Sequence, residues 1–80
     1  MHLRTDTDIT KFLKEVLKCS GEVCFETLEG DHLNLKSTLS QFIFCSLITE
    51  PEILYGGIVL LYDISDRERL KGFMEGNDDE

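Results

Sequence analysis

The feature that most constrains the fold is a change in the spacing of apolar residues within one central segment. Residues 22–27 (EVCFET) and 32–35 (HLNL) alternate in polarity, whereas apolar residues after Ser37 recur at helical spacing. A period of two is typical of a strand with one buried face, and a period of three to four is typical of a helix. The sequence therefore predicts a β-hairpin that runs directly into a helix.

Two registers of this hairpin are possible. A two-residue turn would place Glu26 opposite Leu33 and put a carboxylate on the apolar face. A three-residue loop, with Gly30 in the left-handed conformation, avoids this conflict. We expect the second register, with Glu26 and His32 as a minor surface contact. Its expected pairs are Val23 with Leu35, Phe25 with Leu33, and Glu26 with His32.

An amphipathic helix is expected before the hairpin. Thr5 and Asp8 resemble a capping box, and carboxylates in a first turn interact favourably with the helix dipole. Lysines occupy one face and apolar residues the other, and Gly21 is expected to close the helix. The predicted buried face consists of Ile9, Phe12, Leu13, Val16 and Leu17.

The C-terminal half is expected to contain a loop, a strand and a last helix. Pro51 and the Gly56-Gly57 pair predict a loop over residues 49–57. Residues 58–62 (IVLLY) are continuously apolar, which is typical of an interior strand. Ser65 and Glu68 form a capping box that opens the last helix. This helix should direct Leu70, Phe73 and Met74 toward the core and end at Gly76.

The helix after the hairpin carries the candidate interaction surface. Either Ser37 or Thr38 can cap it, the latter in a capping box with Gln41. Its predicted buried face consists of Leu39, Phe42, Ile43 and Leu47. Phe44 and Ile48 lie on another side, where they either form an exposed apolar stripe or are covered by the 49–57 loop. The candidate surface comprises Phe44, Ile48, Leu54 and Tyr55.

With residues 1–4 as a first strand, the element order is βαββαβα. This order predicts an α+β open-faced sandwich, a four-stranded antiparallel sheet with its helices on one face. A ferredoxin-like topology gives nearly the same order and stays open as an alternative. We expect a single domain over residues 1–76 and an acidic disordered tail over residues 77–80.

The hairpin, Leu35-Lys36-Ser37 and the following helix resemble the middle of HPr, the histidine phosphocarrier of the bacterial sugar phosphotransferase system. The resemblance implies an HPr-like fold whose last strand lies between the first and second strands. It also implies that partners dock around the second helix and the start of the first. Ser37 matches the family's regulatory serine, which is a kinase target in some relatives. Ser37 is therefore a candidate phosphorylation site, and an ordinary helix cap is the simpler interpretation.

The family's phosphorylated histidine is missing from this sequence. It belongs in the loop before the first helix, where this chain has Thr5-Asp6-Thr7-Asp8, and two carboxylates there would repel a phosphoryl group. His2 lies earlier and is at most a weak acceptor. We therefore expect no competent phosphocarrier.

Composition and motifs narrow the function further. A net charge of −8 disfavours nucleic acids and anionic membranes. The sequence has neither an apolar run of about 18 residues nor a signal-peptide core, which predicts a soluble cytoplasmic protein. No catalytic or metal motif is present, so we expect no enzyme, metal or cofactor. A metal interpretation of Asp63, Asp66 and Glu68 is secondary to helix capping.

The function expected is therefore a noncatalytic HPr-like module that binds a protein, including a partner related to the phosphotransferase system or a second copy of itself. Two alternatives remain. One is a regulatory protein phosphorylated at Ser37 or His2, and the other is a ferredoxin-like small-molecule sensing domain. Three cysteines without zinc spacing are expected to be reduced thiols; they are Cys19, Cys24 and Cys45.

Overall fold

The first strand of the hairpin forms the centre of a three-stranded sheet in the computed structural model, which describes residues 1–75. Strand β2 (Val23–Glu26) pairs antiparallel with β3 (His32–Asn34) on one side and with β4 (Ile58–Leu61) on the other. Phe25 faces Leu33 and Glu26 faces His32, which confirms the predicted register. Gly30 has a φ of 96°, a conformation that glycine adopts without steric cost.

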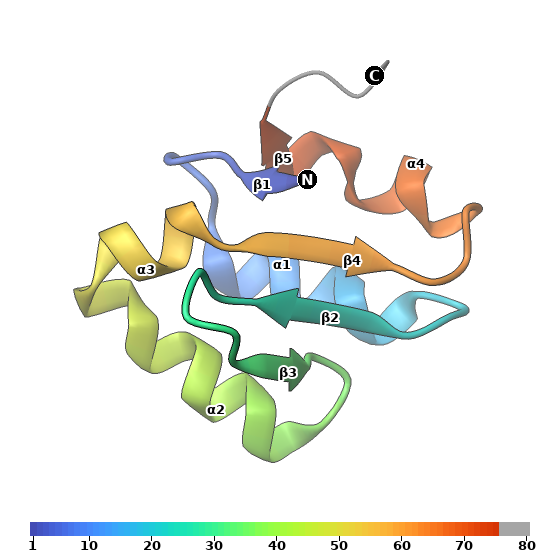
Figure 1. Cartoon of the computed structure of the whole chain (residues 1–80). Coiled ribbons are helices and arrows are strands. Elements are labelled where there is room, and N and C mark those ends of the chain that lie inside the picture. The colour runs from blue at the N-terminus through green and yellow to red at the C-terminus, as the bar shows by residue number, and fades with distance from the viewer. Residues whose placement is uncertain (76–80) are drawn as a thin grey trace.

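Four α-helices are arranged around these strands (Figure 1). Short 3₁₀ turns at Leu47–Thr49 and Lys71–Phe73 extend the second and fourth helices. The α-helices are α1 (Ile9–Lys18), α2 (Thr38–Ser46), α3 (Pro51–Gly56) and α4 (Asp66–Leu70). The α+β class is therefore confirmed.

A single four-stranded sheet was predicted, and this prediction is wrong. Strand β1 (His2–Leu3) pairs antiparallel with an unexpected strand, β5 (Met74–Glu75), so the described residues form one sheet of three strands and one of two. The pair forms because the chain leaves the helical conformation at Phe73, whose carbonyl accepts from the Arg4 amide at 2.9 Å. The Val59 amide donates to the Met1 carbonyl at 2.7 Å, which places the start of the chain beside β4.

Two local predictions in the C-terminal half are also wrong. Pro51 does not prevent a helix in the 49–57 segment but begins α3, because the first turn of a helix does not need the amide hydrogen that proline lacks. Ser65 makes no side-chain cap for α4; its hydroxyl donates instead to Asp63 Oδ1 at 2.7 Å. The predicted stop at Gly76 and the predicted tail at 77–80 lie outside the described residues.

Helix α1 follows its pattern, with a shift at its start. Asp8 is the N-cap, and its Oδ1 accepts from the Lys11 amide at 3.2 Å, so Thr5 lies outside the helix. Leu17 was placed on the buried face but is 55% exposed, because the helix ends one residue later. The other predicted core residues of α1 are buried, namely Ile9, Phe12, Leu13 and Val16.

The core lies where α1, α2 and the sheet meet. Phe44 is fully buried between two other phenylalanines, with ring centroids 5.9 Å from Phe12 and 5.0 Å from Phe25. The backbone of Gly57 approaches the sheet so closely that a Cβ there would lie 2.4 Å from Phe25 Cζ. A bulkier residue at position 57 would therefore displace β4 or the core.

Candidate functional site

The predicted interaction surface is largely buried. Phe44 is 0% exposed and Leu54 is 1% exposed, so neither can contact a partner from the folded protein, and their assignment to an exposed surface is wrong. Tyr55 is half-buried and packs against the core. Ile48 alone is well exposed, at 53%.

The exposed apolar residues of α2 are those that were predicted to be buried. Leu39 is 70%, Phe42 is 71% and Ile43 is 45% exposed, and only Leu47 of the predicted buried face is half-buried. The helix turns about 100° per residue, so Phe42 lies roughly 200° from Phe44, on the opposite side. Since α2 is apolar on both sides, its pattern alone does not determine which side is buried.

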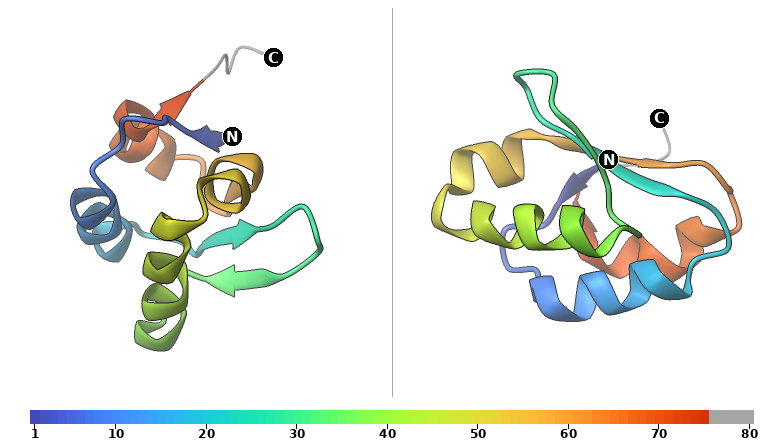
Figure 2. Two further views of the ribbon diagram at one scale, coloured as in Figure 1. Left: turned by 90° about the vertical axis from the view of Figure 1, so that its left-hand side faces the viewer. Right: turned by 90° about the horizontal axis from the view of Figure 1, so that it is seen from below.

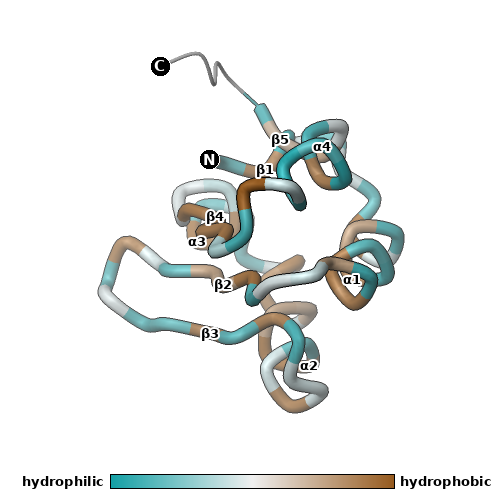
Figure 3. The backbone as a smooth tube through the Cα atoms, turned by 90° about the vertical axis from the view of Figure 1, so that its right-hand side faces the viewer, coloured by the Kyte–Doolittle hydropathy of each residue, from teal (hydrophilic) through white to brown (hydrophobic). Residues whose placement is uncertain are grey.

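We define the α2 face as Leu39, Phe42 and Ile43, which lie within about 100° of one another around the helix. No charged residue occurs from Ser37 to Thr49, although surface helices usually carry charges on their outer side. Figure 3 shows the difference as a mostly white and brown α2 beside a strongly mixed α1. Contiguous exposed apolar side chains of this kind are a feature of interaction sites.

A groove lies beside the α2 face. Its volume is about 330 Å³, and Ile43 belongs to both the groove and the α2 face. The hairpin turn, which forms one wall, projects away from the helices (Figure 2). The apolar lining consists of Leu33, Ile43, Leu47 and Ile53, and the polar lining consists of Thr27, Glu29, Asp31 and His32.

Ser37 is an exposed N-cap of α2. Its Oγ accepts from the Ser40 amide at 3.5 Å, a long hydrogen bond. The capping box of Thr38 and Gln41 does not form, because Gln41 Nε2 donates to the Leu35 carbonyl at 2.8 Å. The adjacent cation, Lys36 Nζ, donates to the Cys19 carbonyl at 2.6 Å. The serine hydroxyl is therefore accessible, while its neighbouring lysine is engaged elsewhere.

The segment before α1 holds structural contacts. Arg4 Nε lies 3.1 Å from Asp6 Oδ1, and this hydrogen bond and ion pair lower the pKa of Asp6. His2 Nδ1 lies 2.8 Å from the Gly57 carbonyl oxygen, an acceptor, so this nitrogen donates. One ring nitrogen of His2 therefore serves to hold β1 against the end of α3.

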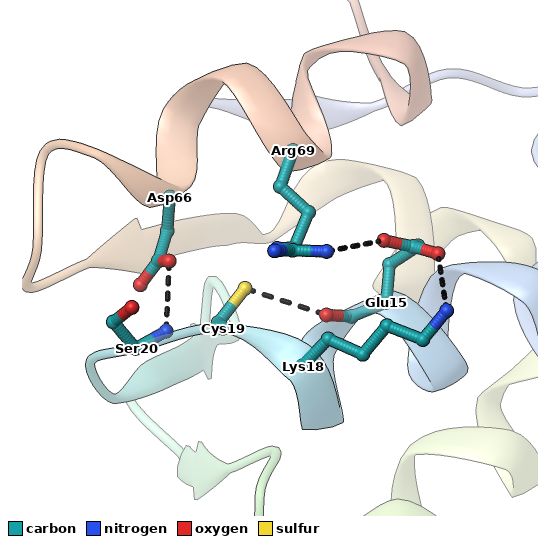
Figure 4. A network of polar contacts seen from close by, with 6 residues as sticks. All are labelled: Glu15, Lys18, Cys19, Ser20, Asp66 and Arg69. Carbon is teal, nitrogen blue, oxygen red and sulfur yellow. Dashed lines mark hydrogen bonds and ion pairs between the residues drawn. The ribbon is translucent and has the colours of Figure 1, made fainter.

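Asp66 has a role that the sequence did not reveal. It is 3% exposed, and its two oxygens each accept a backbone hydrogen bond of 2.8 Å, one from Ser20 (Figure 4) and one from Gly21. These two bonds lower the pKa of Asp66 below its ordinary value of 3.8. Asp66 thus fixes the turn after α1 to α4, a contact between segments 45 or more residues apart that no local pattern predicts.

The three acidic side chains near α4 serve different partners. Asp63 accepts from Ser65, Asp66 binds the turn after α1, and Glu68 pairs with Lys71 at 3.6 Å. Arg69 reaches Glu15 of α1 at 3.3 Å, beside Lys18, and the Arg69 hydrogen bond lowers the pKa of Glu15 (Figure 4). Within residues 1–75 no group of three or more metal-binding side chains is arranged to hold an ion.

The cysteines are free thiols. Burial raises the pKa of Cys19 and of Cys24, which makes both less reactive. Cys45 is exposed on α2, beside Phe42.

No helix among residues 1–75 combines the length and apolar character required to cross a membrane. No family model matches the chain, and no curated protein or solved structure shows significant similarity to it.

Proposed function

We propose that this protein is a noncatalytic, HPr-like, cytoplasmic module that acts by binding another protein. The observation that carries the proposal is the α2 face, an uncharged helix surface on which Leu39 is 70% and Phe42 is 71% exposed. Large exposed apolar side chains do not make a chain of net charge −8 more soluble, but a bound protein would bury them.

The HPr-like part of the proposal is supported by the neighbours of β4. This strand pairs with β2 on one side, and on the other side its Val59 amide donates to the Met1 carbonyl at the start of the chain. The resemblance implies this position for the fourth strand, between the first and the second. The position of β4 therefore favours an HPr-like module over a ferredoxin-like sensing domain. The α2 face also lies on the element around which the family docks its partners.

The noncatalytic part is supported by the residues before α1. A phosphocarrier needs a histidine beside positive charge and free amides. Here Asp8 occupies the cap position, and Arg4 is paired with Asp6. A phosphoryl group would meet two carboxylates in this segment, so we expect no phosphotransfer through it.

The test is Phe42→Glu, which places a charge in the middle of the α2 face without touching the core. Ile64→Glu is the matched control, because Ile64 is 82% exposed and lies beyond β4. We expect Phe42→Glu to abolish complex formation, measured by light scattering and by affinity capture, while Ile64→Glu retains it. If both variants fold and bind like the wild type, the α2 face is not the docking site.

A titration with the general phosphotransferase enzyme tests whether the partner belongs to that system. Amide shifts of residues 5–8 and 37–48 in NMR spectra would indicate docking at the α2 face. A dimer that shows no shifts would indicate self-association and a role outside sugar transport.

Modification of Ser37 is a second candidate function, favoured by the exposure of this serine at the start of α2. A phosphate there would interact with the positive end of the helix dipole. Incubation with the serine kinase of the system and ATP should add one phosphate in mass spectra, and Ser37→Ala should prevent it. A parallel incubation with the general enzyme and phosphoenolpyruvate tests His2. Absence of any mass increase under conditions that label an authentic HPr would end this candidate.

A further inference from the structure

The groove beside the α2 face combines an apolar floor with an acidic rim. Leu33 of β3 and Ile53 of α3 face it from two elements, and Ile43 connects it to the α2 face. Glu29 and Asp31 line it from the hairpin turn. The groove therefore offers apolar burial at its base and negative charge at its edge.

The surroundings of the groove add further negative charge. Glu50 and Glu52 line a second pocket that shares Ile53 with the groove, and Glu26 lies 3.9 Å from His32 Nδ1 on the rim. Neither lysine nor arginine is among the residues that line the groove. The carboxylates Glu29 and Asp31 thus have no cationic side chain in the groove itself.

Several basic residues of the described chain have other partners. Lys18 and Arg69 contact Glu15, and Lys71 contacts Glu68. These contacts involve α1 and α4, whereas the groove lies between the hairpin, α2 and α3. A ligand that neutralises the rim must therefore bring its own positive charge.

We propose that this groove binds a basic amphipathic segment of another protein. Apolar side chains of the segment occupy the floor formed by Leu33, Ile43 and Ile53, and its lysines or arginines pair with Glu29 and Asp31. The proposal rests on the protein-binding function and adds the chemistry of the partner. Helix-in-groove binding with charged flanks is a common mode of recognition, and rim charges set its rate and salt dependence.

A second copy of this chain is a less suitable occupant. A symmetric contact through the groove places the same acidic rim on both sides of the interface, between two molecules that each carry a net charge of −8. Like charges that face one another oppose association. Charge complementarity therefore favours a cationic partner.

The experiment selects random peptides of about 16 residues, roughly four helical turns, against the immobilised full-length protein at low salt. We expect the selected peptides to be enriched in lysine or arginine together with apolar residues at helical spacing. Addition of these peptides should shift the NMR signals of Leu33, Ile43 and Ile53 of the protein. Affinity should fall at least 3-fold between about 0.05 M and 0.5 M salt, because the rim pairs are screened.

Three variants locate the binding. Ile43→Ser should weaken the selected peptides about 10-fold or more. The double variant Glu29→Gln, Asp31→Asn should weaken them about 3- to 10-fold. Glu68→Gln with Glu75→Gln makes the same change in net charge on the opposite part of the fold, and this control should leave affinity within about 2-fold.

Several results would overturn the proposal. These are selected peptides without basic enrichment, shifts that map away from the groove, or equal losses in the rim and control variants. A wild-type dimer that Ile43→Ser converts to a monomer would also overturn it, by assigning the groove to a second copy. These failures differ from a failure of the proposed function, in which Phe42→Glu leaves all protein binding intact.

Discussion

Helices α1 and α2 are similar in length, at ten and nine residues, but they use their apolar residues differently. Helix α1 has lysines on its outer side and buries Phe12 and Val16, so its sequence specifies its buried face. Helix α2 has no charge, and Phe44 is its one buried residue. Helix α1 therefore presents one apolar face, which packs against the core, whereas α2 packs through Phe44 and leaves Leu39 and Phe42 exposed.

The largest expected effects are at Phe12 and Phe44, two of the three fully buried phenylalanines. Phe12→Ala and Phe44→Ala should each lower the free energy of unfolding by about 3–5 kcal/mol, because each removes a fully buried ring that contacts another aromatic. Phe42→Ala, on the outer side of α2, should change it by about 0.5 kcal/mol or less. Urea unfolding monitored by circular dichroism measures all three. A larger loss for Phe42 than for Phe44 would reverse the assignment of the faces.

A smaller effect is expected at the contact that anchors the end of α1. Asp66→Asn should unfold at lower urea than the wild type at pH 7, since a neutral amide replaces a carboxylate that accepts two backbone hydrogen bonds. The pKa of Asp66 is lowered in the folded protein, so its charge stabilises the fold above the ordinary value of 3.8 and this contribution is lost as the pH falls below it.

The difference between the wild type and Asp66→Asn should therefore narrow from pH 5 towards pH 3. Glu68→Gln is the control, because Glu68 is 81% exposed and pairs with Lys71 at the surface. Urea midpoints measured along the pH series would contradict this role of Asp66 if the two variants behaved alike.

The N-cap residues of α1 and α2 also differ in their expected contribution to stability. Asp8→Ala and Ser37→Ala should each cost about 0.5–2 kcal/mol, because each leaves one amide of the first turn unsatisfied. The larger loss is expected for Asp8, whose hydrogen bond is 3.2 Å against 3.5 Å for Ser37 and whose charge favours the helix dipole. Thermal unfolding in low and high salt distinguishes the charge contribution, which salt should reduce for Asp8 alone.

The smallest effects are expected at exposed leucines. Leu17→Ser on α1 and Leu39→Ser on α2 should each change stability by about 0.5 kcal/mol or less, because these side chains are 55% and 70% exposed. Their effects on binding should differ, with Leu39→Ser weakening capture of the partner and Leu17→Ser leaving it unchanged. Equal effects on binding would place part of the docking site on α1.

Sequence reasoning succeeded where the pattern had one solution. The hairpin register followed from keeping Glu26 off the apolar face, and α1 followed from the separation of its lysines from its apolar residues. It failed for β5, which exists because two residues near each end of the chain pair with one another. Pairing between segments so far apart leaves no local signal.

The exposed apolar side chains of α2 were predicted on the wrong side of the helix. Both Phe44 and Phe42 are aromatic residues of an uncharged helix, so burial of either one satisfies the sequence pattern. Residues of the groove were missed for another reason, since Ile53 was assigned to a loop and Leu33 to the core alone. The sequence feature that could have indicated an exposed apolar side is the absence of charge from Ser37 to Thr49, because α2 then has no charged side to face the solvent.

What the sequence by itself determined is the α+β class, the hairpin register, the buried face of α1 and the position of α2. These depend on spacing and capping within short segments, where local geometry has one favourable outcome. The tertiary structure alone decided that Phe44 packs between Phe12 and Phe25, that β5 pairs with β1 and that Asp66 holds the turn after α1. Each of these depends on which distant segments meet, and that choice is made by the packing of the whole core.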